Sequence, residues 1–288
     1  MNRLSLGTVQ FGTAYGVANK SGKVKTSEVD RMIQYCRDHG ILDLDTASSY
    51  GDAETVLGEV GVDGFNIVSK FPPLRPNGSD LRDQIYTSVS KSLENLKVES
   101  LYGALFHRAS DIVDIDKVNE IFRELKSDGL VLKTGVSYYT EQEILKTHLN
   151  DFSIDIAQVP VNIIDRTFAS AKSSIFKGKD IEVHGRSVFL QGLLLMNIND
   201  MHPYFSRWTD LWKRWESVTG GNQQIKAQIC LSYLKQLTDI DCIVVGAQSL
   251  EQLSKIHEAF DLEDKDKSID GFFSNDPDLI YPYNWKAL

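Results

Sequence analysis

Cysteine, proline and long apolar runs are all scarce in this sequence. The 288 residues contain 3 Cys and 7 Pro, and the cysteines stand far apart at Cys36, Cys230 and Cys242. An odd number of cysteines, each within an apolar pattern, predicts buried thiols and argues against disulfides and a zinc site. No stretch approaches the roughly 18 apolar residues of a membrane-spanning helix, and the amino terminus lacks the apolar segment of a signal peptide. We therefore expect a cytoplasmic protein with no metal and no membrane contact.

Positive charge is also in short supply. The chain has 31 Lys and Arg against 40 Asp and Glu, which gives a net charge of −9. This balance argues against a surface for nucleic acid or anionic membrane, because such surfaces carry an excess of basic residues. The apolar fraction of 42% is ordinary for a globular protein with a well-buried core. The composition favours a soluble partner or a small substrate, and it leaves the oligomeric state open.

Strand-like and helix-like patterns alternate along most of the chain. Short apolar stretches predict strands at 3–8, 41–45, 65–70, 101–106, 130–137, 154–160, 181–187 and 242–245. Helical spacing of apolar residues predicts helices at 53–60, 81–96, 115–125, 225–237 and 250–260, another that starts at Ser27 as its N-cap, and a short one after Thr140. Eight strands, each followed by a helix, predict a single-domain (β/α)8 TIM barrel over residues 1–288. Two segments fall outside the repeat, a long loop around 197–221 and a C-terminal tail around 261–288.

Several side chains with useful chemistry stand at the carboxyl ends of predicted strands. Asp45, Lys70 and His107 end three consecutive strands, and Tyr50 follows in the loop after the first of them. Taken singly, each has an ordinary structural explanation, such as a turn that starts at Asp45 or a solvated lysine at a strand end. In a barrel, however, the carboxyl ends of all strands converge on one mouth, which is where barrel enzymes hold their active sites. We therefore expect these four side chains to meet.

The four residue types fit one chemical task. Tyrosine has an ordinary pKa of about 10, which is high for proton exchange near neutral pH. A buried lysine beside it would lower that pKa, and a carboxylate paired with the lysine would keep the ammonium charged and fixed. The sequence thus predicts that Lys70 and Asp45 tune Tyr50 as a proton donor, and that His107 donates a hydrogen bond to the same substrate oxygen.

These residues lie in motifs that resemble those of the aldo-keto reductase superfamily. Residues 6–12 (LGTVQFG) are similar to the opening motif of that family, and residues 45–51 (DTASSYG), Lys70 and residues 105–107 (LFH) match its catalytic motifs in order. The resemblance runs from about Leu4 to Phe260. It implies an NAD(P)H-dependent oxidoreductase without metal, in which Tyr50 protonates a carbonyl oxygen as hydride arrives from nicotinamide.

The resemblance also assigns residues to the cofactor. These positions are Gly12, Thr13, Asp45, Ser137, Gln158, Arg186, Ser187, Gly246, Gln248 and Gln252. Tyr138 stands where the family has an asparagine, and Arg186 stands where a tyrosine usually stacks on nicotinamide, although a guanidinium can also lie flat on a ring. Residues 244–253 resemble the adenosine-phosphate loop, where amides at a helix start meet phosphate. Gln248 replaces a frequent cation there, so Lys255 is the alternative partner for a 2′-phosphate, and we expect NADP(H) ahead of NAD(H).

The resemblance implies a small carbonyl substrate, an aldehyde or a ketone. Residues 7–19 are similar to the opening of bacterial relatives associated with surface-polysaccharide biosynthesis, which suggests a sugar-derived carbonyl. Two other functions use the same fold. One is a nicotinamide-binding regulatory module with little turnover, and the other is a redox-neutral epimerase or lyase that uses bound NAD(P).

Overall fold

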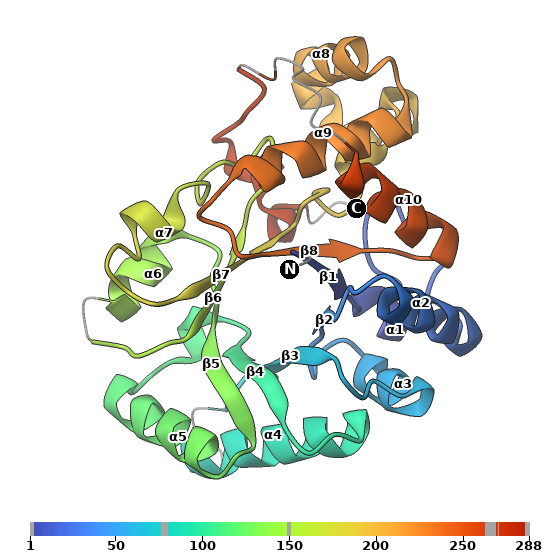
Figure 1. The fold of residues 1–288 in the computed structure, drawn as a ribbon. Helices are drawn as coiled ribbons and strands as arrows, with labels where there is room; N and C mark the ends of the chain where they lie inside the picture. Colours follow the sequence, from blue (N-terminus) through green and yellow to red (C-terminus); the bar gives the residue numbers. More distant parts are fainter. Residues whose placement is uncertain (1–2, 76–79, 149–150, 263–268, 270, 286–288) are drawn as a thin grey trace.

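The barrel is complete within the part of the chain that the computed structural model describes, which is residues 3–75, 80–148, 151–262, 269 and 271–285. Eight parallel strands close in sequence order (Figure 1). They are β1 (Leu4–Gly7), β2 (Asp43–Asp45), β3 (Asn66–Phe71), β4 (Leu101–Phe106), β5 (Val131–Ser137), β6 (Ile156–Pro160), β7 (Glu182–Arg186) and β8 (Cys242–Gly246). The ring is closed by β1 and β8, with Leu4 opposite Ile243 and Gly7 opposite Gly246. The predicted single-domain (β/α)8 fold is confirmed.

Helices surround the strands in Figure 1. They are α1 (Val9–Gly12), α2 (Thr26–Asp38), α3 (Ala53–Val60), α4 (Leu81–Leu96), α5 (Ile115–Ser127), α6 (Glu141–His148), α7 (Ala171–Ser174), α8 (Thr209–Thr219), α9 (Gln223–Gln236), α10 (Leu250–Asp261) and α11 (Pro277–Ile280). Ser27 is not the N-cap of α2, because the helix already begins at Thr26 and Lys25 occupies the cap position. The helix expected after β6 is reduced to the four residues of α7.

The segment predicted as a long loop around 197–221 is largely ordered. Two short 3-10 helices precede α8, which covers Thr209–Thr219. The reason is its aromatic content, since Trp212 and Trp215 lie one turn apart and are both 1% exposed. Their indole N–H groups donate to the carbonyls of Phe205 and Leu194 at 2.9 Å. The tryptophans therefore pack as one face of a helix, and the prediction of a long loop was wrong.

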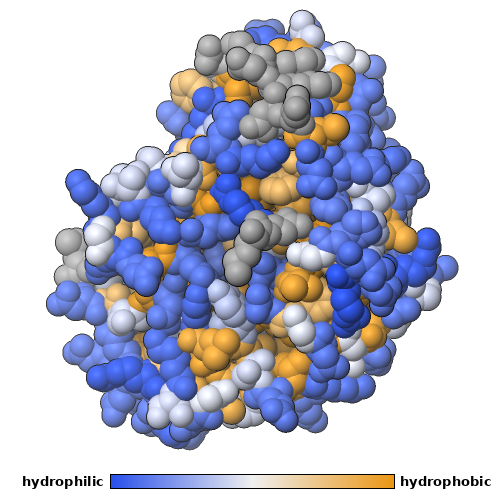
Figure 2. Space-filling view, in the orientation of Figure 1, coloured by the Kyte–Doolittle hydropathy of each residue, from blue (hydrophilic) through white to orange (hydrophobic). Residues whose placement is uncertain are grey.

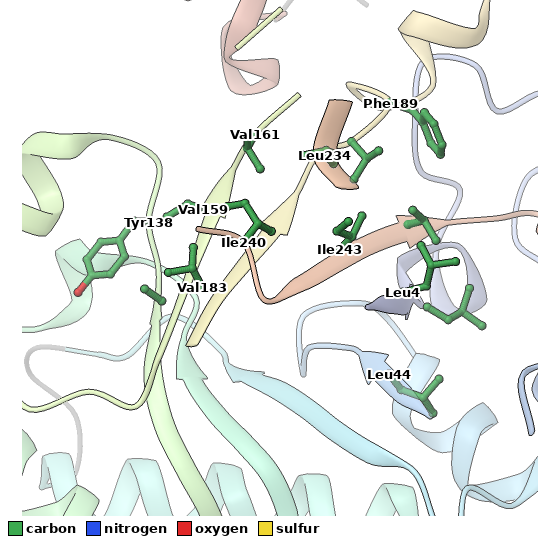
Figure 3. Packing of buried hydrophobic residues seen from close by; sticks show 14 of the residues in the cluster. Leu4, Leu44, Tyr138, Val159, Val161, Val183, Phe189, Leu234, Ile240 and Ile243 are labelled. Carbon is green, nitrogen blue, oxygen red and sulfur yellow. The ribbon is translucent and has the colours of Figure 1, made fainter. Parts of the chain in front are cut away.

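Apolar side chains from the strands form the layer between sheet and helices. Figure 3 shows Leu4, Leu44, Val159, Val183 and Ile243 in this layer, and none of them is more than 1% exposed. Burying each such side chain contributes about 1.5–3 kcal/mol before the entropy of ordering is counted. This core fixes the strands, and the strands in turn fix the positions of the residues at their carboxyl ends.

The outer surface is mainly hydrophilic on the face shown in Figure 2. None of the helices in the described ranges has the length and apolar character that crossing a bilayer requires. Cys36, Cys230 and Cys242 are all buried and free, as the sequence predicted. The charged run 263–267, which begins the C-terminal tail, lies outside the described residues.

Candidate active site

A cavity of about 650 Å³ opens at the carboxyl ends of the strands. Its walls come from the loops that follow β1, β2, β4, β5, β7 and β8, together with Gln158 of β6. Of the positions predicted from the sequence, Thr13, Asp45, Tyr50, His107, Ser137, Gln158, Arg186, Ser187, Gly246, Gln248 and Gln252 line this cavity. A volume of this size lies within the range of pockets that bind small ligands and cofactors.

Asp45 and Lys70 form a buried ion pair at the base of the cavity. The ammonium of Lys70 donates to both carboxylate oxygens of Asp45, at 2.7 and 2.8 Å, and to the carbonyl of Thr46 at 2.8 Å. The pairing follows from the sheet, because β2 and β3 are neighbours and Asp45 lies opposite Val68, two residues before Lys70. Gln158 of β6 donates its amide to the second Asp45 oxygen at 2.6 Å. All three ammonium protons of Lys70 are therefore committed.

Tyr50 is held above this pair by a tight loop. The ring centroid of Tyr50 lies 5.3 Å from the Lys70 ammonium nitrogen and 5.8 Å from the ring of His107, which it meets edge-on. Gly12 packs against the same loop, so closely that a Cβ on Gly12 would lie 1.6 Å from the Tyr50 carbonyl oxygen. Gly12, which the sequence assigned to the cofactor, does not line the cavity. It allows the Tyr50 loop to approach instead.

The pKa of Tyr50 is raised above its ordinary value, mainly by burial and secondly by the Asp45 carboxylate. This contradicts the expectation that Lys70 lowers it. The hydrogen bonds explain the difference, because the charge of Lys70 is compensated by Asp45 and its protons point to Asp45 and Thr46. A raised pKa keeps the phenol protonated at neutral pH.

His107 is neutral at physiological pH. Burial, and then the charges of Lys70 and Arg186, lower its pKa to about 4. Its Nδ1 lies 3.0 Å from the hydroxyl of Ser49, a residue that the sequence reading did not single out. If the Ser49 hydroxyl donates to Nδ1, the remaining imidazole proton lies on Nε2. Ser49 was overlooked because a serine between a serine and a tyrosine carries no signal until the fold brings β4 next to it.

A chain of hydrogen bonds joins β5, β6 and β7. The hydroxyl of Ser137 donates to the side-chain oxygen of Gln158 at 3.3 Å, and Arg186 donates from Nε to Ser137 Oγ at 3.3 Å. Tyr138 does not take the place of a cofactor-binding asparagine, because its side chain is fully buried and its hydroxyl pairs with Thr147 at 2.9 Å. Figure 3 shows the Tyr138 ring directed outward from the strands.

The guanidinium of Arg186 is held by three hydrogen bonds and by one aromatic contact. Besides Ser137, it donates to the hydroxyl of Ser187 at 3.2 Å and to the carbonyl of Tyr138 at 3.0 Å. Its central carbon lies 4.2 Å from the ring centroid of Tyr139. Arg186 therefore does stack on an aromatic ring, and that ring belongs to the protein.

The start of α10 is already occupied by protein groups. The backbone N–H of Gln248 donates to the side chain of Gln252 at 2.7 Å, and the N–H of Leu250 donates to the carboxylate of Glu28 in α2 at 2.7 Å. Lys255 pairs with Glu251 on the helix surface at 2.5 Å and does not line the cavity. The amides and the lysine expected to meet a phosphate are thus engaged elsewhere.

Other residues that line the cavity were not predicted, among them Gln10, Tyr15 and Tyr139. Gln10 lines it, and the Oε1 atom of Gln10 is buried with no hydrogen-bond partner among the described residues. Tyr15 and Tyr139 line it as well. Tyr139 also meets Tyr283 of the C-terminal tail edge-on, with ring centroids 5.4 Å apart. The glycine-bearing loop after β1 was a signal for the first two, but nothing in the sequence paired the tail with β5.

The fold and the site together describe a (β/α)8 barrel protein with a tyrosine, a lysine, an aspartate and a histidine at the barrel mouth. Comparison with known proteins identifies its family. The Aldo/keto reductase family model matches residues 3–272. The chain therefore belongs to the aldo/keto reductase family.

Individual relatives agree with this assignment. The uncharacterized oxidoreductase YcsN of Bacillus subtilis is 30% identical over 135 residues, which cover 41% of this chain and 45% of YcsN. The aldo-keto reductase YhdN of Bacillus subtilis is 23% identical over 70% of this chain and 63% of YhdN. The matched region thus covers less than half of YcsN and less than two thirds of YhdN. Aldo-keto reductase AKR11C1 from Bacillus halodurans, solved in a holo form, has the same fold, with a TM-score of 0.71 and 18% identity over 91% of this chain and 88% of that one.

Proposed function

We propose that this protein is an NAD(P)H-dependent reductase of a small aldehyde or ketone, with Tyr50 as the proton donor. The observation that carries the proposal is the convergence of a protonated phenol and a neutral imidazole on one cavity, above the Lys70–Asp45 pair. Membership of the aldo/keto reductase family and the oxidoreductase names of its relatives support it.

The cavity fits a nicotinamide dinucleotide. It runs from the ends of β4 and β5 to the start of α10, and its amide and hydroxyl groups suit a carboxamide and ribose. The Oε1 atom of Gln10, which has no hydrogen-bond partner in the described part of the chain, offers an acceptor to a ligand hydroxyl or amide. Ser137, Gln158 and Arg186 would hold the nicotinamide end, and Thr13, Ser187, Gly246, Gln248 and Gln252 the rest. When bound, the cofactor supplies the hydride.

Each of these side chains then has its own role at the substrate oxygen. Tyr50, protonated at neutral pH, donates its proton to that oxygen as negative charge develops there. His107 donates a hydrogen bond to the same oxygen from Nε2, and Ser49 orients the ring through Nδ1. Lys70 and Asp45 fix the carboxyl ends of β2 and β3, and with them the loop that holds Tyr50.

Cofactor preference depends on the start of α10. A 2′-phosphate favours a cation, but Lys255 is paired with Glu251, and the Glu28 carboxylate accepts from Leu250 at this helix start. These acids remove most of the advantage that the sequence alone gave to NADP(H). We therefore propose that both NADPH and NADH are used, with affinities within about tenfold of each other.

The substrate end of the cavity is aromatic and polar. Tyr15 and Tyr139 stand beside Tyr50 and His107, a combination that suits a hydroxylated carbonyl compound such as a sugar derivative. A regulatory module or a redox-neutral epimerase would bind the cofactor with the same residues, but would not consume it.

The replacement Tyr50→Phe tests the proposal. We expect kcat for a panel of sugar aldehydes and keto-sugars to fall at least about a hundredfold, because a positioned acid is lost. NADPH and NADH binding, followed by quenching of tryptophan fluorescence, should remain unchanged. Near-normal reduction by the variant would exclude Tyr50 as the donor, and cofactor that binds to the native protein without consumption by any carbonyl would favour the other two functions.

A further inference from the structure

The position of Tyr50 decides where a nicotinamide ring can act in the cavity. Reduction moves a hydride from the ring to the carbonyl carbon and a proton from Tyr50 to the carbonyl oxygen, so the ring and Tyr50 must face the same carbonyl group. Ser137 and Gln158 line the cavity at this end. Gln158 is hydrogen-bonded at 2.6 Å to Asp45, whose ion pair with Lys70 lies below Tyr50. On the proposed function, the ring therefore lies against Tyr50, Ser137 and Gln158.

Arg186 borders this ring site through direct contacts. Its Nε donates to the hydroxyl of Ser137 at 3.3 Å, and the same hydroxyl donates to the side-chain oxygen of Gln158 at 3.3 Å. Its central carbon lies 4.2 Å from the ring centroid of Tyr139, which also lines the cavity. The guanidinium is thus held beside the ring site before any ligand enters, as electrostatic preorganisation requires.

The charge of this guanidinium has no acidic partner. Arg186 donates elsewhere to the hydroxyl of Ser187 and to the carbonyl of Tyr138, both of which are neutral. Within the described ranges no carboxylate forms an ion pair with it. Asp165, a buried acid in the loop after β6, accepts the backbone N–H of Thr167 through one oxygen, and its other oxygen has no partner among the described residues. Arg186 therefore presents a fixed positive charge in a partly buried place, where screening is weak.

We propose that Arg186 makes the cavity select the reduced form of the nicotinamide cofactor over the oxidised form. The two forms share the adenosine, the phosphates and the riboses, and they differ at the ring, which is neutral when reduced and positively charged when oxidised. A fixed guanidinium beside the ring repels the oxidised form, whereas the reduced form carries no ring charge for it to repel. This inference rests on the proposed function for the location of the ring.

The selection has a direction in catalysis. When the hydride and the Tyr50 proton have moved to the carbonyl group, the products are an alcohol and a ring that has gained one positive charge. Arg186 then favours release of the oxidised cofactor and its exchange for the reduced one. The same charge weakens the complex from which alcohol oxidation would start, so the protein is biased towards carbonyl reduction.

The test compares the dissociation constants of NADPH and NADP⁺ and needs no turnover. Isothermal titration calorimetry of the purified protein measures both, and their ratio isolates the ring because every other group is common to the two ligands. We expect the native protein to bind NADP⁺ more weakly than NADPH, and Arg186→Gln to shrink this ratio about tenfold, chiefly by tightening NADP⁺. Arg186→Lys keeps the charge, so its ratio should stay closer to that of the native protein than to that of Arg186→Gln.

A matched control separates this charge from charge in general. Arg82→Gln makes the same chemical change on the outer surface of α4, where Arg82 pairs with Glu124, and it should leave the ratio unchanged. Arg186→Met replaces Arg186→Gln if near-ultraviolet circular dichroism shows that the latter is unfolded.

Three results would overturn the proposal. They are an unchanged ratio in the charge-free variant, an equal weakening of both forms, and an Arg186→Lys variant that behaves like Arg186→Gln. A native protein that binds neither form would overturn it together with the cofactor assignment. If the ratio shifts as expected but no carbonyl is reduced, the reductase function fails and the selection by Arg186 stands.

Discussion

Two lysines are buried within the described part of this barrel, and their immediate surroundings are nearly the same. Lys70 donates to Asp45 and to the carbonyl of Thr46. Lys226 of α9 donates to the Glu216 carboxylate at 2.6 Å, to the Met196 carbonyl at 2.7 Å and to Asn197 at 3.3 Å. The Lys70 side chain is 1% exposed and that of Lys226 is 0% exposed. Each ammonium thus has one carboxylate partner and three committed protons.

The difference lies in what surrounds each pair. Lys226 ties α8 and α9 to the segment that carries Met196, which forms part of the cavity wall. The Lys70 pair lies below Tyr50 and His107, and a second strand residue, Gln158, binds its carboxylate. The comparison teaches that a buried ion pair is not itself a sign of catalysis. Its position relative to a proton-donating group decides what it does.

The largest expected effect is on stability and concerns both lysines. Lys70→Met leaves the buried Asp45 carboxylate without its partner, which costs about 3–5 kcal/mol. Lys226→Met leaves the Glu216 carboxylate unpaired and should cost less, because the Glu216 side chain is 24% exposed and water can solvate it. Urea unfolding followed by circular dichroism should show the larger loss for Lys70→Met. Replacing the acid as well, in Lys226→Met with Glu216→Leu, should recover at least about 1 kcal/mol, since no unpaired charge remains at that site. A double variant no more stable than the single one would contradict this account.

The next effect distinguishes the two lysines. Lys70→Met should lower kcat at least about a hundredfold, because Asp45 loses its partner and the Tyr50 loop loses its support. Lys226→Met should keep kcat within about threefold, measured at a temperature where both variants are folded. Steady-state reduction of the best carbonyl in the panel measures both values. Equal losses in the two variants would mean that Lys70 acts only through stability.

The comparison also shows how far sequence reasoning could go. The barrel, its strand ends and the meeting of Asp45, Tyr50, Lys70 and His107 followed from apolar periodicity and from motifs, because the carboxyl ends of parallel strands share one edge. Lys226 gave no signal, since a lysine inside an amphipathic helix is usually solvated. Its burial depends on α8, which lies in the segment expected to be a loop.

Electrostatics were harder to predict than position. The sequence suggested that Lys70 would lower the pKa of Tyr50, whereas the structure has that pKa raised, by burial first. Residue types alone do not reveal that all three Lys70 protons point to Asp45 and Thr46. The amides at the start of α10 give a second example. The sequence does not reveal that the Leu250 N–H donates to Glu28, because Glu28 lies in a helix more than 200 residues earlier in the chain.

A smaller effect is expected at the far end of the cavity. Glu28→Gln removes the carboxylate next to the Leu250 N–H and keeps an acceptor oxygen in its place. It should improve NADPH affinity by about five- to tenfold and change NADH affinity by less than about twofold, since only the former carries a 2′-phosphate. Isothermal titration calorimetry at low ionic strength measures both constants. Glu258→Gln, on the exposed surface of the same helix and about two turns from its start, is the matched control. An equal gain for both nucleotides would remove Glu28 from cofactor selection.

The smallest effect expected is the response of turnover to mild acid. His107 has its pKa lowered to about 4, so it loses a proton more readily than a free imidazole and stays neutral down to about pH 5. The neutral ring is the form that can accept from Ser49, 3.0 Å from Nδ1, while it donates from Nε2. Between about pH 8 and pH 5, kcat should therefore change less than about threefold and decline only below that range. Ser49→Ala frees the ring to adopt either tautomer, so it should lower kcat a few fold at every pH in this window without moving the acid limb. A profile of kcat against pH for the native protein and this variant measures both effects. A half-maximal rate near pH 6.5 in the native protein would show that His107 titrates like an exposed histidine. That result would contradict the lowering of its pKa by burial, Lys70 and Arg186.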